Sequence, residues 1–138
     1  MPVVRPVSVR LEREVDAEVR DIARRDDRPL GRVINELLDR ALRMRRFPGI
    51  VFVEGPAGVR AHLSGSGLDI WEIVALARAY GSPEKAREAL PTLSEADVRL
   101  ALAYGGTYPD EIEERIRRNE RSIEDLMREY PFVRKIPA

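Results

Sequence analysis

The sequence predicts a mainly α-helical protein: one strand and two helices that dimerise, then a small β-hairpin, a three-helix bundle of helix-turn-helix outline and a C-terminal helix. Three observations predict this fold class. Apolar and polar residues alternate over residues 6–11, as in a half-buried strand. Apolar residues recur every three or four positions through most of the later chain, as in amphipathic helices. Two short apolar runs flank a turn that contains Gly and Pro, as in a hairpin.

Composition and charge limit the class of protein. The 138 residues, 43% of them apolar, suffice for one compact domain or two small ones. Cysteine is absent, which excludes disulfides and thiolate chemistry. The chain has no apolar run of membrane-spanning length and no signal peptide, so we expect a cytoplasmic protein without membrane contact. Residues 1–46 carry twelve arginines against nine acids, and this excess suits contact with phosphates.

Two amphipathic helices follow the strand. The first is predicted over residues 12–25, and the Asp and Pro residues that come next end it. The second is predicted over residues 31–46 and has the most regular apolar spacing in the chain. The apolar stripes consist of Val15, Val19, Ile22 and Ala23 in the first helix and of Val33, Ile34, Leu37, Leu38, Ala41 and Leu42 in the second.

The N-terminal strand has no partner strand nearby in the sequence. One strand and two one-sided helices cannot enclose a core within about 40 residues without disulfides, metal or oligomerisation. We therefore expect a dimer in which two copies of the strand pair antiparallel about a two-fold axis. Val7, Val9 and Leu11 would then be buried, and Ser8 and Arg10 would face outward.

Residues 4–45 resemble the ribbon-helix-helix family of dimeric DNA-binding proteins, with the matching stretches VSVRL, VDAEVRDIARRDD and LGRVINELLDRAL. The resemblance implies that outward strand residues enter the major groove of double-stranded operator DNA and that the second helix binds a backbone phosphate at its N-terminus. By position, Ser8 and Arg10 would contact bases, and the amides at Gly31 and Arg32 would bind phosphate. A two-stranded ribbon fits the major groove, Arg pairs with guanine through two hydrogen bonds, and a helix N-terminus binds anions.

Two residues depart from the pattern of this family. Pro6 stands where such strands often carry a base-reading side chain, so we expect readout to shift toward Arg5. Gly31 stands where Ser or Thr usually caps the helix. The alternative interpretation is that Ser8 and Arg10 form an ordinary solvated face of a dimer ribbon.

A second part of the chain begins near Pro48, where a Pro-Gly pair marks a boundary. Two short strands are predicted around the turn EGPAG, and three helices joined by short turns follow. Gly81 ends the first of these helices, Ser82 caps the second, and Ser94 with Asp97 forms a capping box for the third. The three helices are predicted over residues 68–80, 82–91 and 94–104.

Residues 48–110 resemble the domain of unknown function 433 family, with the matching stretches GSPE, PTLSEADV and ALAY after a strand, a Gly-rich turn and a helix. The resemblance implies an antitoxin of a type II toxin–antitoxin pair whose toxin is a nuclease of the PIN-domain type. The stretch GSGLDI departs from the family's usual GTRI-V and lacks its arginine. Glu95 and Asp97 at the start of the third helix repel phosphate, so we rank a structural or protein-binding role above DNA reading.

A C-terminal helix is predicted between the prolines at 109 and 131. Its apolar seam runs from Ile112 to Tyr130, and two interpretations remain: docking onto the chain's own middle domain, or insertion into a groove of a partner. The predicted ion pairs of the helix join Glu111 to Arg115, Glu113 to Arg117 and Glu114 to Arg118.

The tail after this helix is the predicted toxin-binding segment. Apolar residues surround two cations there, and an apolar terminus is usually docked on something. The resemblance implies a carboxylate cluster for Mg²⁺ in a PIN-type toxin, which Arg134 or Lys135 would occupy while Phe132 docks beside it.

No catalytic constellation is visible in the sequence. His62 has no Cys or evident nucleophile nearby, so neither a triad nor a His-rich metal site can be assembled. The glycines match no nucleotide-binding motif. We therefore expect a protein that is not an enzyme and uses no cofactor or metal.

These observations predict three parts and one function. Residues 1–46 would dimerise and bind DNA, residues 47–109 would form a helix-turn-helix-like domain, and residues 110–138 would form a helix with a partner-binding tail. We expect this protein to be the antitoxin of a type II system. It would bind its operator as a homodimer or as a higher oligomer and repress its own operon. It would also neutralise a PIN-type ribonuclease. The alternative is a stand-alone dimeric transcriptional regulator without a toxin.

Overall fold

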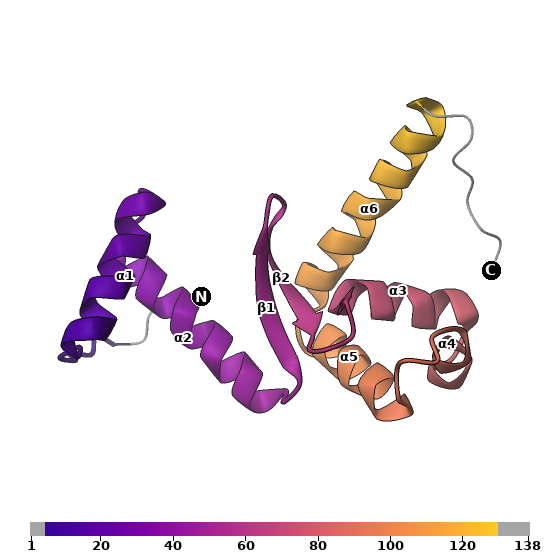
Figure 1. Cartoon of the computed structure of the whole chain (residues 1–138), viewed down its shortest axis with the longest axis horizontal. Coiled ribbons are helices and arrows are strands. Elements are labelled where there is room, and N and C mark those ends of the chain that lie inside the picture. Colours follow the sequence, from indigo (N-terminus) through magenta and orange to yellow (C-terminus); the bar gives the residue numbers. More distant parts are fainter. Residues whose placement is uncertain (1–4, 130–138) are drawn as a thin grey trace. The chain divides into compact units, whose positions relative to one another are not determined.

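The structure is a computed structural model of the whole chain and describes residues 5–129 (Figure 1), without the side chains of residues 121–127 and 129. It divides the chain into two compact units, residues 1–43 and 44–138, which we call the N-terminal and C-terminal units. The described residues form six helices and one three-stranded sheet. The prediction of a mainly helical protein with a small hairpin is confirmed.

The N-terminal unit contains two helices, α1 (Arg13–Arg25) and α2 (Leu30–Arg46), and the last turn of α2 passes into the C-terminal unit. The chain turns between them with Asp27 in the left-handed region, at φ 49°. Residues 5–12 have no regular secondary structure in the single chain. The strand predicted over residues 6–11 is therefore not formed in the single chain, as is expected of a strand whose backbone groups have no partner strand.

The sheet of the C-terminal unit consists of β1 (Ile50–Gly55), β2 (Gly58–Leu63) and β3 (Leu68–Asp69), antiparallel in the order β1-β2-β3. The first two strands form the predicted hairpin. The third strand is too short to be predicted from alternation, since it has two residues. Its register places Asp69 opposite His62.

Four helices complete the C-terminal unit: α3 (Ile70–Tyr80), α4 (Pro83–Ala89), α5 (Glu95–Thr107) and α6 (Pro109–Glu129). The predicted boundary signals are confirmed. Gly81 ends α3 at φ 87°, and the Ser82 hydroxyl accepts a hydrogen bond from the Lys85 amide at 3.2 Å. The Ser94 hydroxyl accepts a hydrogen bond from the Asp97 amide at 3.1 Å, and the Asp97 carboxylate accepts one from the Ser94 amide at 3.0 Å. This capping box stabilises the start of α5.

Helix α5 extends past the predicted end at residue 104. A Cβ at Gly105 would lie 3.2 Å from Cγ2 of Val74 on α3, so glycine at this position allows the two helices to approach closely. The helix ends at Thr107. Close packing therefore offsets the low helix propensity of glycine here.

The core of the C-terminal unit lies between the sheet and its helices. Tyr104 is fully buried and contacts the Phe47 ring edge-on, with ring centroids 5.4 Å apart. Its hydroxyl donates to Glu111 at 2.7 Å. The other buried core residues are Ile50, Ala61, Leu63, Ile70, Ile73, Val74, Ala77, Ala86, Leu93, Val98, Ala101, Ile112 and Ile116.

Helix α6 begins beside α3 and α5 and extends beyond them (Figure 1). Ile112 and Ile116 are buried, so the first half of its seam docks onto the chain's own C-terminal unit. The second half of the seam, Ile123, Leu126 and Tyr130, lies outside the residues whose side chains the structure describes.

One of the three predicted ion pairs along α6 forms, and residues of the other two make tertiary contacts. Glu114 bonds Arg118 at 3.1 Å as predicted. Glu113 instead pairs with Arg78 on α3, and Arg115 donates to the Val59 carbonyl of β2 at 3.0 Å. Tertiary contacts therefore compete with i,i+4 pairing for these side chains.

Candidate nucleic-acid interface

The N-terminal unit leaves most of its apolar side chains in solvent. Val19 and Val33 are the buried apolar residues among its described residues. Val7 and Val9 are 79% and 72% exposed, and Leu38 and Leu42 on α2 are each 58% exposed. A helix pair with two buried side chains cannot form a stable core alone, and an apolar patch of this kind marks an interaction surface.

The predicted base-reading residues precede α1. Arg5, Ser8 and Arg10 are all exposed. In an extended segment, Ser8 and Arg10 fall on the side opposite Val7 and Val9. One side is therefore apolar and the other polar, as the dimer ribbon requires.

The predicted phosphate-binding residues lie in the first turn of α2. Gly31 and Arg32 are exposed, and a Cβ at Gly31 would meet nothing within 4 Å. The Val33 amide donates to the Pro29 carbonyl at 3.2 Å, so the amides of Gly31 and Arg32 precede this first hydrogen bond of the helix. No acid occupies the first turn, which leaves the positive end of the helix dipole free of a carboxylate.

Several arginines of the N-terminal unit are paired with acids. Glu36 binds both Arg28 and Arg40. The hydrogen bond from Arg28 holds the pKa of Glu36 below its ordinary value, against the opposing effect of burial. This pair ties the turn after α1 to α2. The further pairs are Arg20 with Asp16 at 2.9 Å, Arg24 with Asp21 at 3.3 Å and Arg43 with Asp39 at 3.0 Å.

Arginines near the predicted DNA-contacting segments are not paired. Within the described part of the chain, Arg5, Arg10, Arg13 and Arg32 form no ion pair. Arg5 and Arg10 precede α1, and Arg13 and Arg32 lie in the first turns of α1 and α2. Unpaired guanidinium groups keep all their donors for an anionic ligand.

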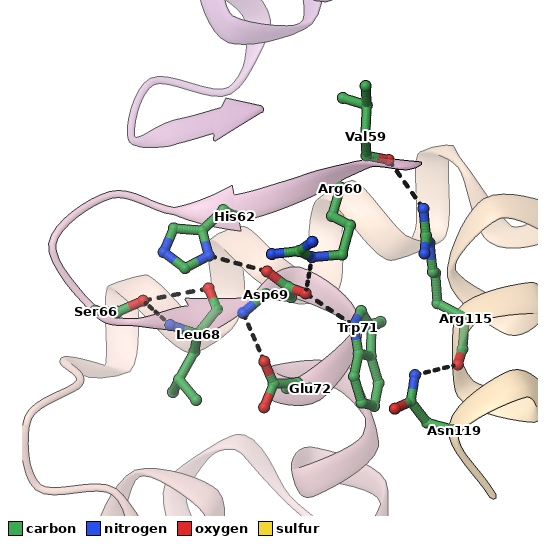
Figure 2. Close-up of polar contacts among 10 residues, drawn as sticks. All are labelled: Val59, Arg60, His62, Ser66, Leu68, Asp69, Trp71, Glu72, Arg115 and Asn119. Carbon is green, nitrogen blue, oxygen red and sulfur yellow. Dashed lines mark hydrogen bonds and ion pairs between the residues drawn. The ribbon is translucent and has the colours of Figure 1, made fainter. Parts of the chain in front are cut away.

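Among its described residues, the C-terminal unit contains a buried polar cluster centred on Asp69 (Figure 2). Arg60, His62 and Trp71 point toward this carboxylate and bond it at 2.7, 3.0 and 3.1 Å. The Asp69 amide donates to Glu72 at 3.0 Å at the start of α3. This cluster was not predicted from the sequence because it depends on the pairing of β2 with β3.

Asp69 is ionised in this cluster. Burial raises the pKa of its carboxyl, but the hydrogen bonds from His62, Arg60 and Trp71 outweigh burial and hold the pKa below its ordinary value. The contacts of Asp69 join the sheet to α3. Ser66, in the β2–β3 turn, bonds the backbone of Leu63 and Leu68, which gives it a structural role.

Replacing Asp69 by asparagine is expected to lower the free energy of unfolding by about 2 kcal/mol at pH 7, because charge-assisted hydrogen bonds are lost. The stabilisation by ionised Asp69 is complete above the ordinary pKa of 3.8 and falls as the pH drops through its lower folded pKa. Denaturant titrations from pH 7 to pH 2 should therefore show that the free energy of unfolding of the unchanged protein falls as Asp69 is protonated. Asp69→Asn should not show this loss. Asp110→Asn, which removes an exposed carboxylate, is the control and should keep that loss.

Three further points concern the predicted toxin-binding residues, candidate metal sites and membrane contact. The predicted toxin-binding residues Phe132, Arg134 and Lys135 lie outside the described residues. Among the residues whose side chains the structure describes, no cluster of three or more His, Asp or Glu side chains forms a candidate metal site. No described helix has the length and apolar content to cross a membrane.

Comparisons of the chain with protein-family models, with curated proteins and with solved structures found no match.

Proposed function

We propose that this protein is a dimeric DNA-binding repressor whose N-terminal segment forms a two-stranded ribbon with a second copy and reads the major groove. The observation that carries the proposal is the exposure of Val7, Val9, Leu38 and Leu42 in a unit with two buried apolar residues. A second copy would cover these side chains and provide the partner strand that residues 6–11 need.

The ribbon would place its polar side chains in the groove. Arg10 would bond guanine through two hydrogen bonds, Ser8 would contact several bases, and Arg5 would extend the readout beyond Pro6. The amides of Gly31 and Arg32 would hold a backbone phosphate at the start of α2. The absence of an acid from this turn supports such a role.

The C-terminal unit is better suited to a protein partner than to DNA. Arg99, the cation near the start of α5, bonds Glu95 at 2.6 Å and Glu84 at 3.3 Å. The acids on both sides of this guanidinium would repel phosphate. A role of residues 44–138 in protein contacts is therefore favoured.

We further propose, from the resemblance of residues 48–110 to antitoxins, that the partner is a PIN-type ribonuclease and that its binding is coupled to repression. Phe132, Arg134 and Lys135 would contact it. The test is co-purification of the neighbouring gene's product with the full chain and with a chain lacking residues 131–138. Full binding to the shortened chain contradicts the tail's role, and no binding to either favours a stand-alone regulator.

Replacing Arg10 by alanine is expected to weaken binding to DNA from upstream of the gene at least about tenfold, because one bidentate base contact contributes roughly 1–3 kcal/mol. Arg20→Ala removes the same charge, but Arg20 already bonds Asp16, so its effect should stay within about twofold. The measurement is fluorescence anisotropy over a salt series, with each variant confirmed as a folded dimer by sedimentation. Equal binding by Arg10→Ala and the unchanged protein contradicts the ribbon as the reader.

A further inference from the structure

Strand β1 lies at the edge of the sheet and has one side open. Among the described strands, β2 lies between β1 and β3, so β1 has a neighbour on one side only. The Ser64 amide donates to the Gly49 carbonyl at 2.9 Å, which makes these opposite residues a hydrogen-bonded pair. Because such pairs alternate along an antiparallel ladder, the amides and carbonyls of Ile50, Phe52 and Glu54 point away from β2.

Most of these outward backbone groups have no hydrogen-bond partner in the part of the chain that the structure describes. The Ile50 amide donates to the Phe47 carbonyl at 3.1 Å. The amides and carbonyls of Phe52 and Glu54 form no hydrogen bond with any described residue. Donors and acceptors in this position are the groups through which a sheet binds a further strand.

β1 also lacks the features by which exposed sheet edges usually avoid pairing, which are a short strand, proline, lysine and a bulge. It has six residues, and its register with β2 is continuous. Four apolar residues of high strand propensity, residues 50–53, precede its one charged residue, Glu54. β3, at the opposite edge, has two residues. The open edge of β1 is therefore suited to the addition of a strand.

A second copy of β1 matches this edge by its own sequence. In an antiparallel pair centred on Phe52, the two Phe52 residues exchange both backbone hydrogen bonds, and each Glu54 amide donates to the second copy's Ile50 carbonyl. Val51 then lies beside the second copy's Val53, a favourable cross-strand pair of β-branched side chains. The two Glu54 carboxylates lie at opposite ends of the pair, about 13 Å apart along the strands, so their repulsion is screened.

We propose that β1 pairs antiparallel with β1 of a second copy and joins two sheets into one continuous sheet. The contacts of one strand pair are too few to hold a dimer alone. The inference therefore rests on the proposed function, because a ribbon dimer holds two C-terminal units in one particle and raises the local concentration of their β1 edges. The C-terminal unit thereby gains a self-association surface separate from the ribbon.

The absence of cysteine from the sequence allows a specific cross-linking test. Val51→Cys and Val53→Cys are made in separate full-length chains, mixed in denaturant, refolded together and oxidised. In the proposed register these positions are opposite each other, with Cα atoms about 4.5 Å apart, within the reach of a disulfide. Each variant alone places its two cysteines on a diagonal about 7–8 Å apart, so the mixture should form at least about fivefold more covalent dimer than either variant alone.

Glu54→Pro is the variant that blocks the edge, because proline removes the outward amide and leaves the hydrogen bonds to β2 intact. The Glu54 side chain is exposed, so Glu54→Ala, which retains the amide, is the matched control. Introduced into both cysteine chains, Glu54→Pro should lower the yield of covalent dimer at least about fivefold, since half of the hydrogen bonds between the copies are lost. Glu54→Ala should keep the yield within about twofold of the unchanged sequence. Trp71 fluorescence confirms that each variant is folded.

The contrary outcomes separate this inference from the proposed function. If the mixture cross-links no better than the single variants while the unchanged protein dimerises and binds DNA, β1 does not pair and the proposed function stands. If folded Glu54→Pro cross-links as well as Glu54→Ala, the strand edges are not the contact. If the mixture cross-links as expected but the dimeric protein binds no DNA, the inference stands and the proposed function fails. Should Glu54→Pro not fold, the cysteine mixture alone decides.

Discussion

Replacing Val9 by aspartate should abolish the dimer and leave the N-terminal unit unfolded. In the proposed ribbon Val9 is buried between two copies, so the variant would place two carboxylates in an apolar core, at several kcal/mol each. The dimer dissociation constant should rise at least about 1000-fold, which corresponds to about 4 kcal/mol. DNA binding should be lost with it. Sedimentation and circular dichroism measure the dimer and its helix content.

Ser8→Asp is the matched control, because it introduces the same side chain one position away on the opposite side of the strand. It should preserve the dimer and abolish DNA binding, since a carboxylate in the groove repels phosphate. If Val9→Asp remains a dimer at micromolar concentration, the N-terminal segment is not the dimer interface. If both variants lose the dimer, the alternation of the strand is not the cause.

Replacing Tyr104 by alanine is expected to lower the free energy of unfolding of the C-terminal unit by about 3–5 kcal/mol. The side chain is fully buried and packs against Phe47 and Tyr108, with the Tyr108 ring centroid at 4.7 Å. Its removal would leave a large cavity at the centre of the core. Denaturant titration followed by the fluorescence of Trp71, the single tryptophan of the chain, reports on this unit.

Tyr104→Phe separates packing from hydrogen bonding. It keeps the ring and removes the hydroxyl that donates to Glu111 at 2.7 Å. The expected loss is about 1 kcal/mol, because Glu111 is exposed and water replaces the lost donor. Equal losses in the two variants would show that the hydroxyl, and not the ring, stabilises the core.

Local features of the fold were predictable from the sequence. The caps at Ser82 and Ser94 and the stop at Gly81 depend on neighbouring residues only. Periodicity and boundary signals together located the six helices of the described residues. The apolar stripe of α2 was predicted from the sequence. The structure shows that part of this stripe is exposed in the single chain.

Features that depend on distant residues were not predictable. The Asp69 cluster needs the β2–β3 register, which brings together residues seven and nine positions apart. Glu113 was assigned to Arg117 on its own helix but pairs with Arg78, 35 residues earlier. The pairing of arginines with acids, which distinguishes Arg13 from Arg20, also becomes visible only when the side chains are placed.

The small number of buried residues in the N-terminal unit has a consequence for how the proposed repressor would respond to its own abundance. If residues 1–43 fold only when two chains meet, folding of the DNA-reading part is a second-order process, whereas the C-terminal unit folds alone around its own core. At low chain concentration, the concentration of reading-competent protein would grow with the square of the number of chains. Operator occupancy would then rise as a threshold and not in proportion to synthesis.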